Sequence, residues 1–331
     1  MNCKTHNSVF ALFLLLGSFL VIWPCRSLGQ DQLAQAQRTF ASPAEATRAL
    51  IEAAKGHDRL ALRQLFGPQV TNLLTGDVTL DDRHFAEFVR DLAERCDPVP
   101  QGNDQVTLEI GRQAWPFPIP LVKTNGLWRF DTVAGEEEII NRHIGRDEYF
   151  AIGVCRAYVK AQRDYARRMA RADGTLRYAM RLKSQPDQKD GLYWPSAAGE
   201  EASPLSSFVA EASLEHYDWT KGSGPRSFHG YFFRILTRQG AAAPGGRRDY
   251  VQQGEMSGGF ALVAYPVRWG ESGVMTFLVN QDGVVYQRSL GRHSARIAAA
   301  MKEYNPDARW TEVQEAGLLD DHPTGHGTPS P

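Results

Sequence analysis

Apolar residues in the first quarter of the chain recur every three or four positions, which is the spacing of amphipathic helices. This pattern predicts helices over residues 42–56, 60–67 and 81–96. Ser42 stands before the first of them and Glu45 follows three residues later, a combination typical of a helix N-terminus.

From residue 105 the pattern changes to the alternation of strands. Residues 105–111 place their apolar side chains on one face. Two further strands flank Asn125 and Gly126, a pair that favours a tight hairpin because both turn positions need positive φ. Three prolines precede this hairpin and cannot donate backbone hydrogen bonds. We therefore expect an edge strand there, with Trp115 and Phe117 on one side of it.

The middle of the chain predicts one long helical segment, residues 135–169, which Gly145 is expected to kink or to split in two. The last third returns to strands. Two of these lack clean alternation, so we expect both faces of their sheet to be covered. The expected elements are strands at 229–237, 258–266, 273–280 and 284–290, and a closing helix at 294–304.

These elements form two successive blocks, each with helices first and neighbouring strands afterwards, which favours an α+β fold with antiparallel sheets. We place the blocks at residues 43–145 and 146–305. A flexible polar leader at 30–42 and a flexible tail at 306–331 are expected to flank them.

The N-terminus has the three parts of a secretory signal peptide. Lys4 is followed by an apolar run at residues 9–22, and small residues stand before an expected cleavage after Gly29. The apolar run is shorter than the roughly 20 residues that cross a bilayer, although an uncleaved anchor is the alternative. Residues 1–29 therefore predict an exported protein, periplasmic or extracellular, with no membrane span after cleavage.

Export bears on the two cysteines that remain after cleavage, Cys96 and Cys155, because an oxidising compartment permits a disulfide between them. The alternative is two separate buried thiols. The net charge of the 331-residue chain is −1, close to balance. This balance predicts no nucleic-acid partner, since such binding needs a local excess of cations.

The densest polar segment is residues 136–148, which holds the candidate catalytic side chains His143, Asp147 and Glu148. His143 and Asp147 are four residues apart, so on a helix they share a face and are placed to act as an acid–base pair. The alternative is a solvated helix face with weak charge pairs. The sequence has no motif for a metal or a cofactor, and we predict neither.

Aromatic residues close to prolines are the candidate binding residues, because such rings often lie at rims with a packed body and a wet polar tip. If they converge they form a binding surface, and if they are scattered they are core edges. The candidates are Trp115, Phe117, Trp128, Trp194, Tyr265 and Trp269.

Several long motifs carry a resemblance to a known family. "WPFPIPLVK", "VCRAYVKAQRDYA", "KDGLYWP" and "GGFALVAYPVRWGESGVMTFLVNQDGVVYQ" are similar to segments of a family of exported bacterial proteins of unknown function. The resemblance covers residues 40–292 and implies no activity and no catalytic residues. The second block also resembles the soluble head of type IV pilins and pseudopilins. The first block is similar to the cone-shaped domains of the nuclear-transport-factor-like type.

The position of the pilin-like helix argues against assembly into a pilus, because pilins have their apolar assembly helix at the very N-terminus and here a whole block precedes it. Export, the absence of catalytic motifs and the aromatic rims favour a non-catalytic binding or assembly module of the bacterial envelope. Its partner would be a protein or a small molecule. The alternatives are an envelope hydrolase that uses His143, Asp147 and Glu148, and a small-ligand carrier that uses the first block.

Overall fold

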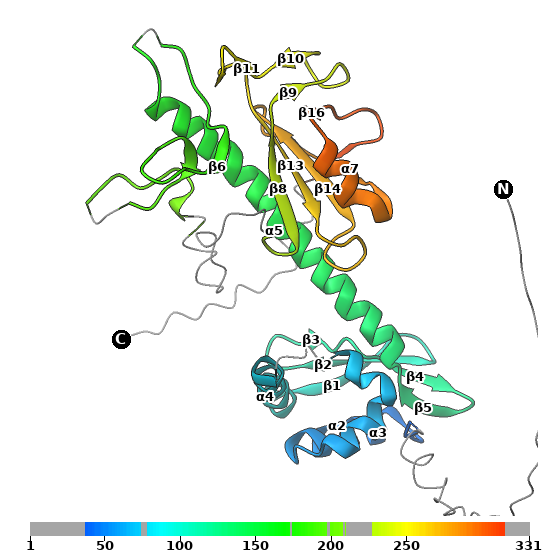
Figure 1. Cartoon of the computed structure of the whole chain (residues 1–331). Helices are drawn as coiled ribbons and strands as arrows, with labels where there is room; N and C mark the ends of the chain where they lie inside the picture. Colours follow the sequence, from blue (N-terminus) through cyan, green and yellow to red (C-terminus); the bar gives the residue numbers. More distant parts are fainter. Residues whose placement is uncertain are drawn as a thin grey trace, which may run out of the picture.

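The computed structural model describes residues 37–73, 78–172, 174–196, 199–207, 209 and 227–314. Two lobes share one long helix, α5 (Thr132–Arg168), as Figure 1 shows. The first lobe, residues 37–131, lies at the N-terminal end of α5. The second lobe, the described residues from 151 to 314, packs along the rest of the helix. Each lobe has its own hydrophobic cluster and a mainly antiparallel sheet, so the predicted α+β class is confirmed.

The helices of the first lobe follow the hydrophobic pattern closely. Ser42 caps the first helix by accepting a hydrogen bond from the Glu45 backbone N–H at 3.3 Å, and the Glu45 carboxylate accepts the Ala41 N–H at 3.2 Å. Asp58 caps the second helix through the N–H groups of Leu60 and Ala61. The helices are α2 (Pro43–Lys55), α3 (Arg59–Phe66), the 3₁₀ turn η1 (Pro68–Leu73) and α4 (Val78–Glu94).

The first sheet has five strands where the sequence predicts three. Val106, Leu108 and Ile110 alternate into the core as expected. One additional strand, residues 96–100, lies at the sheet edge, and its two prolines obscure the alternating pattern of a strand. The other, residues 115–116, is only two residues long. The strands are β1 (Cys96–Pro100), β2 (Gln105–Ile110), β3 (Trp115–Pro116), β4 (Leu121–Thr124) and β5 (Leu127–Phe130), in the order β1-β2-β4-β5 with β3 paired to β2.

The Asn-Gly hairpin is confirmed, because Asn125 and Gly126 have φ values of 53° and 82° and β4 pairs with β5. The prediction that the proline-bearing strand entering this hairpin lies at the edge of the sheet is wrong. The prolines interrupt the strand after β3, and β4 then lies inside the sheet between β2 and β5. Trp115 and Phe117 therefore do not lie on the same side of one strand. Trp115 is exposed, and Phe117 is buried in the core.

Helix α5 continues through Gly145 without a break, so the expected split there is wrong. A single glycine costs a helix only about 1 kcal/mol. Packing against the second lobe supplies more than that, since α5 contributes Ala151, Cys155 and Tyr158 to its cluster. The predicted block boundary at residues 145 and 146 therefore falls inside a helix.

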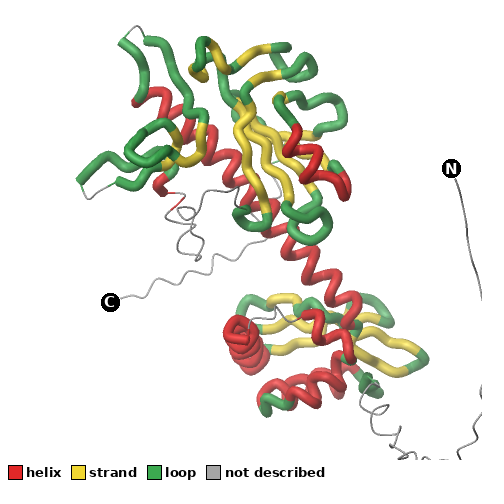
Figure 2. Tube along the Cα trace, in the orientation of Figure 1, coloured by secondary structure: helices red, strands yellow, loops and turns green. Residues whose placement is uncertain are grey.

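The second lobe is built around a five-stranded antiparallel meander in the order β17-β15-β14-β13-β8. Helix α5 covers one face and α7 (Ser294–Ala300) the other (Figures 1 and 2), so the expectation of two covered faces is confirmed. The meander strands are β8 (Tyr231–Leu236), β13 (Ala261–Pro266), β14 (Met275–Asn280), β15 (Val285–Ser289) and β17 (Thr311–Glu312).

Short strand pairs surround this meander and carry the irregular parts of the lobe. They are β6 (Arg181–Lys183) with β7 (Gly191–Tyr193), β11 (Val251–Gln252) with β12 (Glu255–Met256), and β9 (Arg238–Gln239) with both β10 (Arg248–Asp249) and β16 (Glu303–Tyr304). The 3₁₀ turn η2 (Gly291–His293) leads into α7.

Both predicted flexible ends are partly wrong. In the leader, Phe40 is buried and exchanges two backbone hydrogen bonds of 2.8 Å with Trp128 at the free edge of β5. In the tail, β17 pairs with β15 and Trp310 is buried. The predicted signal peptide and residues 315–331 lie outside the described residues.

The two cysteines lie in different lobes, and the disulfide between them is not formed. Cys96 starts β1 and contacts the first hydrophobic cluster, whereas Cys155 is fully buried in the second. Both are free thiols. Burial raises the pKa of Cys96 to about 11 and the pKa of Cys155 to about 12, so both stay protonated at neutral pH. The structure thus has separate thiols, the second of the two alternatives.

Candidate functional site

The predicted catalytic residues do not converge on one cleft. Glu148 turns toward the second lobe, where one carboxylate oxygen accepts the backbone N–H groups of Val274 and Met275 at 2.8 and 2.9 Å. These bonds hold the start of β14 against α5. They give Glu148 a structural role, which the helical spacing alone did not indicate.

Asp147 instead faces a residue that the sequence analysis did not include in this cluster. Its Oδ1 lies 4.0 Å from Nδ1 of His229, and both side chains are largely buried. Burial raises the pKa of Asp147, against the opposite effects of Arg146, His143 and His229. The His229 ring stacks on Phe150 with ring centroids 3.8 Å apart, and its backbone has a positive φ of 42°.

His143 lies one turn before Asp147 on an exposed part of α5. Its Nδ1 is 2.8 Å from Nη2 of Arg146. Partial burial of the ring and then the Arg146 charge lower the pKa of His143, so the ring is neutral near pH 7. The side chain closest to the His143 ring is therefore the Arg146 guanidinium, one turn along the helix. This arrangement is that of a solvated charged helix face rather than of an acid–base pair with Asp147.

A hydroxyl group lies beside the Asp147–His229 pair but is engaged elsewhere. A Cβ placed on Gly230 would lie 2.6 Å from Cβ of Ser272 and 2.7 Å from Oδ2 of Asp147, so the two side chains flank one glycine. The Ser272 hydroxyl donates to the Arg268 carbonyl and accepts the Arg268 N–H. It closes a turn, and this geometry does not direct it at His229.

The six candidate aromatic residues are scattered rather than gathered. Phe117 and Trp128 belong to the first hydrophobic cluster, and Trp194 and Tyr265 belong to the second. The exposed pair are Trp115, whose ring lies under the Arg142 guanidinium at 5.1 Å, and Trp269, whose indole donates to Ser289. The six side chains do not converge on a common surface, so the scattered arrangement, the second of the two alternatives, is the one that the structure has.

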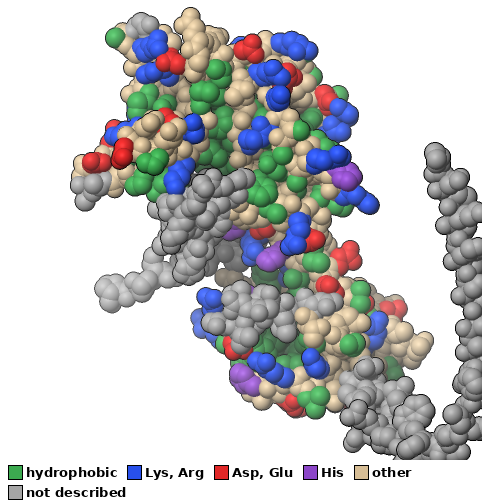
Figure 3. Space-filling model, viewed as in Figure 1, with side chains coloured by type: hydrophobic (Ala, Val, Ile, Leu, Met, Phe, Trp, Pro, Cys, Tyr) green, Lys and Arg blue, Asp and Glu red, His purple; other side chains and the backbone are tan. Residues whose placement is uncertain are grey.

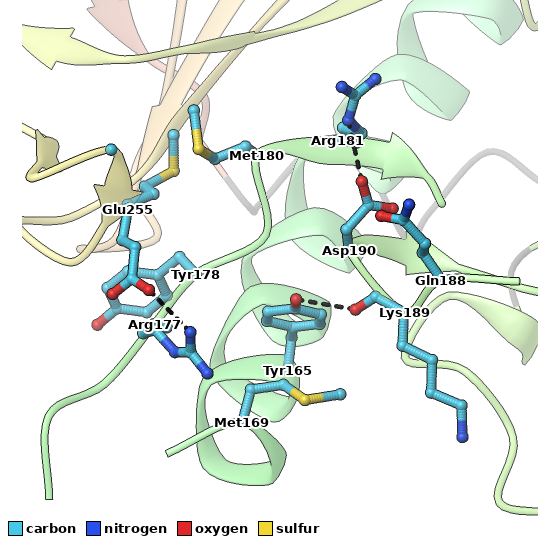
Figure 4. A pocket seen from close by; sticks show the side chains of 12 residues that line it. Tyr165, Met169, Arg177, Tyr178, Met180, Arg181, Gln188, Lys189, Asp190 and Glu255 are labelled. Carbon is cyan, nitrogen blue, oxygen red and sulfur yellow. Dashed lines mark hydrogen bonds and ion pairs between the residues drawn. The ribbon is translucent and has the colours of Figure 1, made fainter. Parts of the chain in front are cut away.

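A pocket at the far end of the second lobe brings together more chemistry than either predicted site. Its volume is about 780 Å³, and Figure 4 shows side chains from three segments around it. Tyr165 comes from the last turn of α5 and Met169 directly follows the helix. Arg177 and Met180 come from the next segment, and Glu255 comes from β12. The other lining residues are Tyr178, Arg181, Gln188, Lys189, Asp190, Gly254 and Met256.

One wall of this pocket carries the Arg177–Glu255 ion pair, which Arg171 joins from outside the lining. The Glu255 carboxylate binds Nη1 of Arg177 at 2.9 Å and Nη2 of Arg171 at 2.6 Å. The hydrogen bond from Arg177 is the largest of the effects that lower the pKa of Glu255, so this carboxylate stays ionised. On the opposite wall Arg181 pairs with Asp190 at 3.2 Å, as the dashed line in Figure 4 marks.

Buried hydrogen bonds fix the positions of these walls. Gln162 of α5 is fully buried and both donates to the Ala179 carbonyl at 2.7 Å and accepts the Ala179 N–H at 2.8 Å. These two hydrogen bonds hold residues 177–180 along the helix. The Tyr165 hydroxyl donates to the Lys189 carbonyl at 2.9 Å and holds the other wall.

Sequence patterns missed this pocket because its segments are irregular and distant along the chain. Residues 177–190 and 254–256 have neither helical nor alternating periodicity that would place their side chains on a common face. The one available signal was the glutamine at position 162, a polar residue on the apolar face of a predicted helix.

Residues 37–313 match the family described as "Protein of unknown function (DUF2950)". The chain belongs to the DUF2950 family. The family match confirms the resemblance drawn from the sequence motifs, and it extends through β17 at the end of the second lobe. The pocket and the Asp147–His229 pair both lie within this DUF2950 region.

No curated protein and no solved structure matches this DUF2950 chain significantly. The resemblances of its blocks to pilin heads and to nuclear-transport-factor-like domains therefore stay predictions. Within the described residues, no helix has the length and apolarity needed to cross a membrane, and no group of three or more His, Cys, Asp or Glu side chains is arranged to hold a metal ion. On the face that Figure 3 shows, basic and acidic side chains are interspersed over the second lobe.

Proposed function

We propose that this chain is a non-catalytic binding module of an exported bacterial protein, and that the pocket at the end of α5 is its ligand site. The observation that carries the proposal is the pocket itself. Its volume of about 780 Å³ lies within the usual range for small-molecule sites, and it combines apolar side chains with a few fixed charges.

The rest of the molecule is consistent with this role. Glu148, one of the candidate hydrolase residues, is engaged by the backbone N–H groups of Val274 and Met275. The first lobe contains a hydrophobic cluster in which Leu50, Leu108 and Phe130 are fully buried. Export remains part of the proposal, and the mature chain would begin at Gln30.

Native mass spectrometry tests the proposal, with the protein recovered gently from the cell envelope of its own bacterial host. We expect the mass of a chain that starts at Gln30 together with a bound small molecule. A matched pair of variants locates the site: Met180 lines the pocket and Leu176 does not, and both side chains are 43% exposed. Met180→Trp should lose the extra mass, and Leu176→Trp should keep it.

The contrary results are equally clear. A wild-type chain without any additional mass would contradict tight ligand binding. Extra mass that persists in Met180→Trp would place the ligand outside this pocket.

A second candidate function rests on the Asp147–His229 contact of 4.0 Å and on the left-handed backbone of His229. Buried acid–base pairs in such strained positions occur at catalytic sites. If this pair is catalytic, a panel of ester, amide, glycoside and phosphoester substrates should reveal turnover by the purified chain. Asp147→Asn should then lower that turnover about a hundredfold, while His143→Gln should not.

A further inference from the structure

The charges and apolar groups of the pocket indicate which chemical class of ligand it takes. Resting on the proposed binding function, we propose that the site accepts a monoanionic carboxylate that carries an aromatic or other bulky apolar group. The argument has three parts: the net charge of the wall, the donors left on Arg177, and the apolar surface opposite.

The side chains that line the pocket carry one positive charge more than they neutralise. Arg177 pairs with Glu255 and Arg181 pairs with Asp190, which leaves the charge of Lys189. Arg171 also binds Glu255 but does not line the pocket. A ligand with one negative charge balances this lining, whereas a phosphate monoester would bring a charge of about −1.5 to −2.

Lys189 supplies this charge from the edge of the pocket. Its ammonium group lies 5.5 Å from the centroid of the Trp194 ring, where a cation–π contact holds it. Figure 4 shows its side chain directed away from the Arg177–Glu255 pair and from the pocket centre.

Arg177 has hydrogen-bond donors to spare for such a ligand. Nη1 binds Glu255, and Nη2 has no hydrogen-bond partner within the described residues. The Arg177 side chain is 40% exposed, so Nη2 can donate a charge-assisted hydrogen bond to a ligand carboxylate. Nε is buried and has no hydrogen-bond partner in the described part of the chain, and it faces away from any ligand.

The apolar side of the pocket suits a bulky group rather than a small anion such as acetate. Tyr165 and Met256 are largely buried and present ring and thioether surface to it. Met169 and Met180 extend this surface from either end, as Figure 4 shows. Methionine side chains adapt to the shape of a bound group and make favourable contacts with aromatic rings.

Isothermal titration of the full mature chain with two matched probes tests the ligand class. N-acetyl-L-phenylalanine is a monoanion with an aromatic body, and N-acetyl-L-phenylalaninamide has the same body without the charge. We expect the acid to bind at least about tenfold more tightly than the amide, because charge-assisted hydrogen bonds are worth that much. Phenyl phosphate and acetate should both bind more weakly than the acid.

Variants at Arg177 assign this preference to the pocket. Arg177→Gln should abolish the roughly tenfold advantage of the acid over the amide. Arg177→Lys keeps the charge but moves the donor, so it should reduce the advantage less than Arg177→Gln. Retained binding of the amide by both variants shows that the lobe still folds. Arg167→Gln is the matched control, since Arg167 pairs with Asp164 on α5 and does not line the pocket.

Each outcome separates the ligand class from the proposed function. Equal binding of the acid and the amide, blocked in both cases by Met180→Trp, would overturn the carboxylate assignment and leave the pocket as a binding site. An unchanged preference in Arg177→Gln would overturn it as well. Failure of both probes to bind would overturn the carboxylate assignment, and the mass of the natural ligand then decides the binding function separately.

Discussion

The two lobes use the same kinds of element but satisfy their buried polar groups differently. In the first lobe the described buried polar side chains are two threonines, Thr47 and, at its junction with α5, Thr132. Each donates a single hydrogen bond to a backbone carbonyl. The second lobe buries a larger set: Gln162, Ser203, Gln239, Thr276, Asn280 and Ser294.

The reason for this difference lies in the backbone that surrounds each core. In the first lobe helices and strands provide most of the backbone hydrogen bonds, and one half-buried amide, Gln37, donates to the Leu65 and Phe130 carbonyls. The second lobe contains irregular segments, and buried amide side chains bind their backbone. Gln162 holds residues 177–180, and Gln239 donates to the Pro244 and Gly246 carbonyls at 2.7 and 2.8 Å. Irregular walls held in this way leave space for a pocket.

The largest expected effect tests whether the two lobes unfold separately. Leu50 and Leu262 are fully buried in the first and second clusters. Truncation of either to alanine should cost about 3 kcal/mol, because it removes packed methyl groups and leaves a cavity. Each lobe has one cysteine as a reporter, so alkylation of Cys96 and Cys155 can be followed in rising urea by peptide mapping.

Leu50→Ala should expose Cys96 at lower urea and leave Cys155 unchanged, and Leu262→Ala should do the reverse. If the urea concentration needed to alkylate both cysteines falls in each variant, α5 couples the lobes into one cooperative unit, and the two lobes do not have separate stabilities.

The next effect addresses the polar cores directly. Gln162→Leu should lower the free energy of unfolding of the second lobe by about 2–3 kcal/mol, because it leaves the Ala179 N–H and carbonyl without their partner. Thr132→Val removes one bond, to the Phe66 carbonyl, and should cost about 1 kcal/mol. Urea titration measures both. Equal losses would mean that the glutamine is no more important than a single threonine.

Two glycines of α5 should respond to alanine with opposite signs. A Cβ at Gly135 would lie 2.5 Å from Cγ1 of Ile119, so Gly135→Ala should destabilise the contact with the first lobe by about 1–3 kcal/mol. A Cβ at Gly145 meets nothing within 4 Å. Gly145→Ala should therefore stabilise the helix by about 0.5–1 kcal/mol. Thermal melting distinguishes the two, and a loss at Gly145 would show that the helix needs its flexibility there.

The smallest effect concerns pH. Burial raises the pKa of Asp147 above its usual value, so the folded chain holds that proton more tightly than the unfolded chain. The stability associated with this proton is present at low pH and is lost as pH rises through the raised pKa. Asp147→Asn does not titrate. Its stability relative to wild type should increase from pH 3 toward neutrality.

Glu255 supplies a control of opposite sign. Its pKa is lowered by the bonds from Arg177 and Arg171, so its contribution is present at neutral pH and is lost as pH falls. Glu255→Gln should lose stability relative to wild type at pH 7 and approach it at low pH. The same trend in both variants would contradict the environments that the structure gives these carboxylates.

The sequence by itself determined most of the regular structure. The helix cap at Ser42, the Asn125-Gly126 hairpin and four of the five meander strands, β8, β13, β14 and β15, follow from local rules. Turn geometry and the burial of one face act on neighbouring residues. It also determined the α+β class and the family resemblance.

Only the tertiary structure decided where the functional groups meet. It separated Cys96 from Cys155, and it placed four of the aromatic candidates in two different cores and the other two on the surface. It also turned Asp147 toward His229, 82 positions further along the chain, and gathered Arg177 and Glu255 around one pocket. Such contacts join irregular segments far apart in sequence. Periodicity reports only the face that each element buries, and it does not report which distant segment lies against that face.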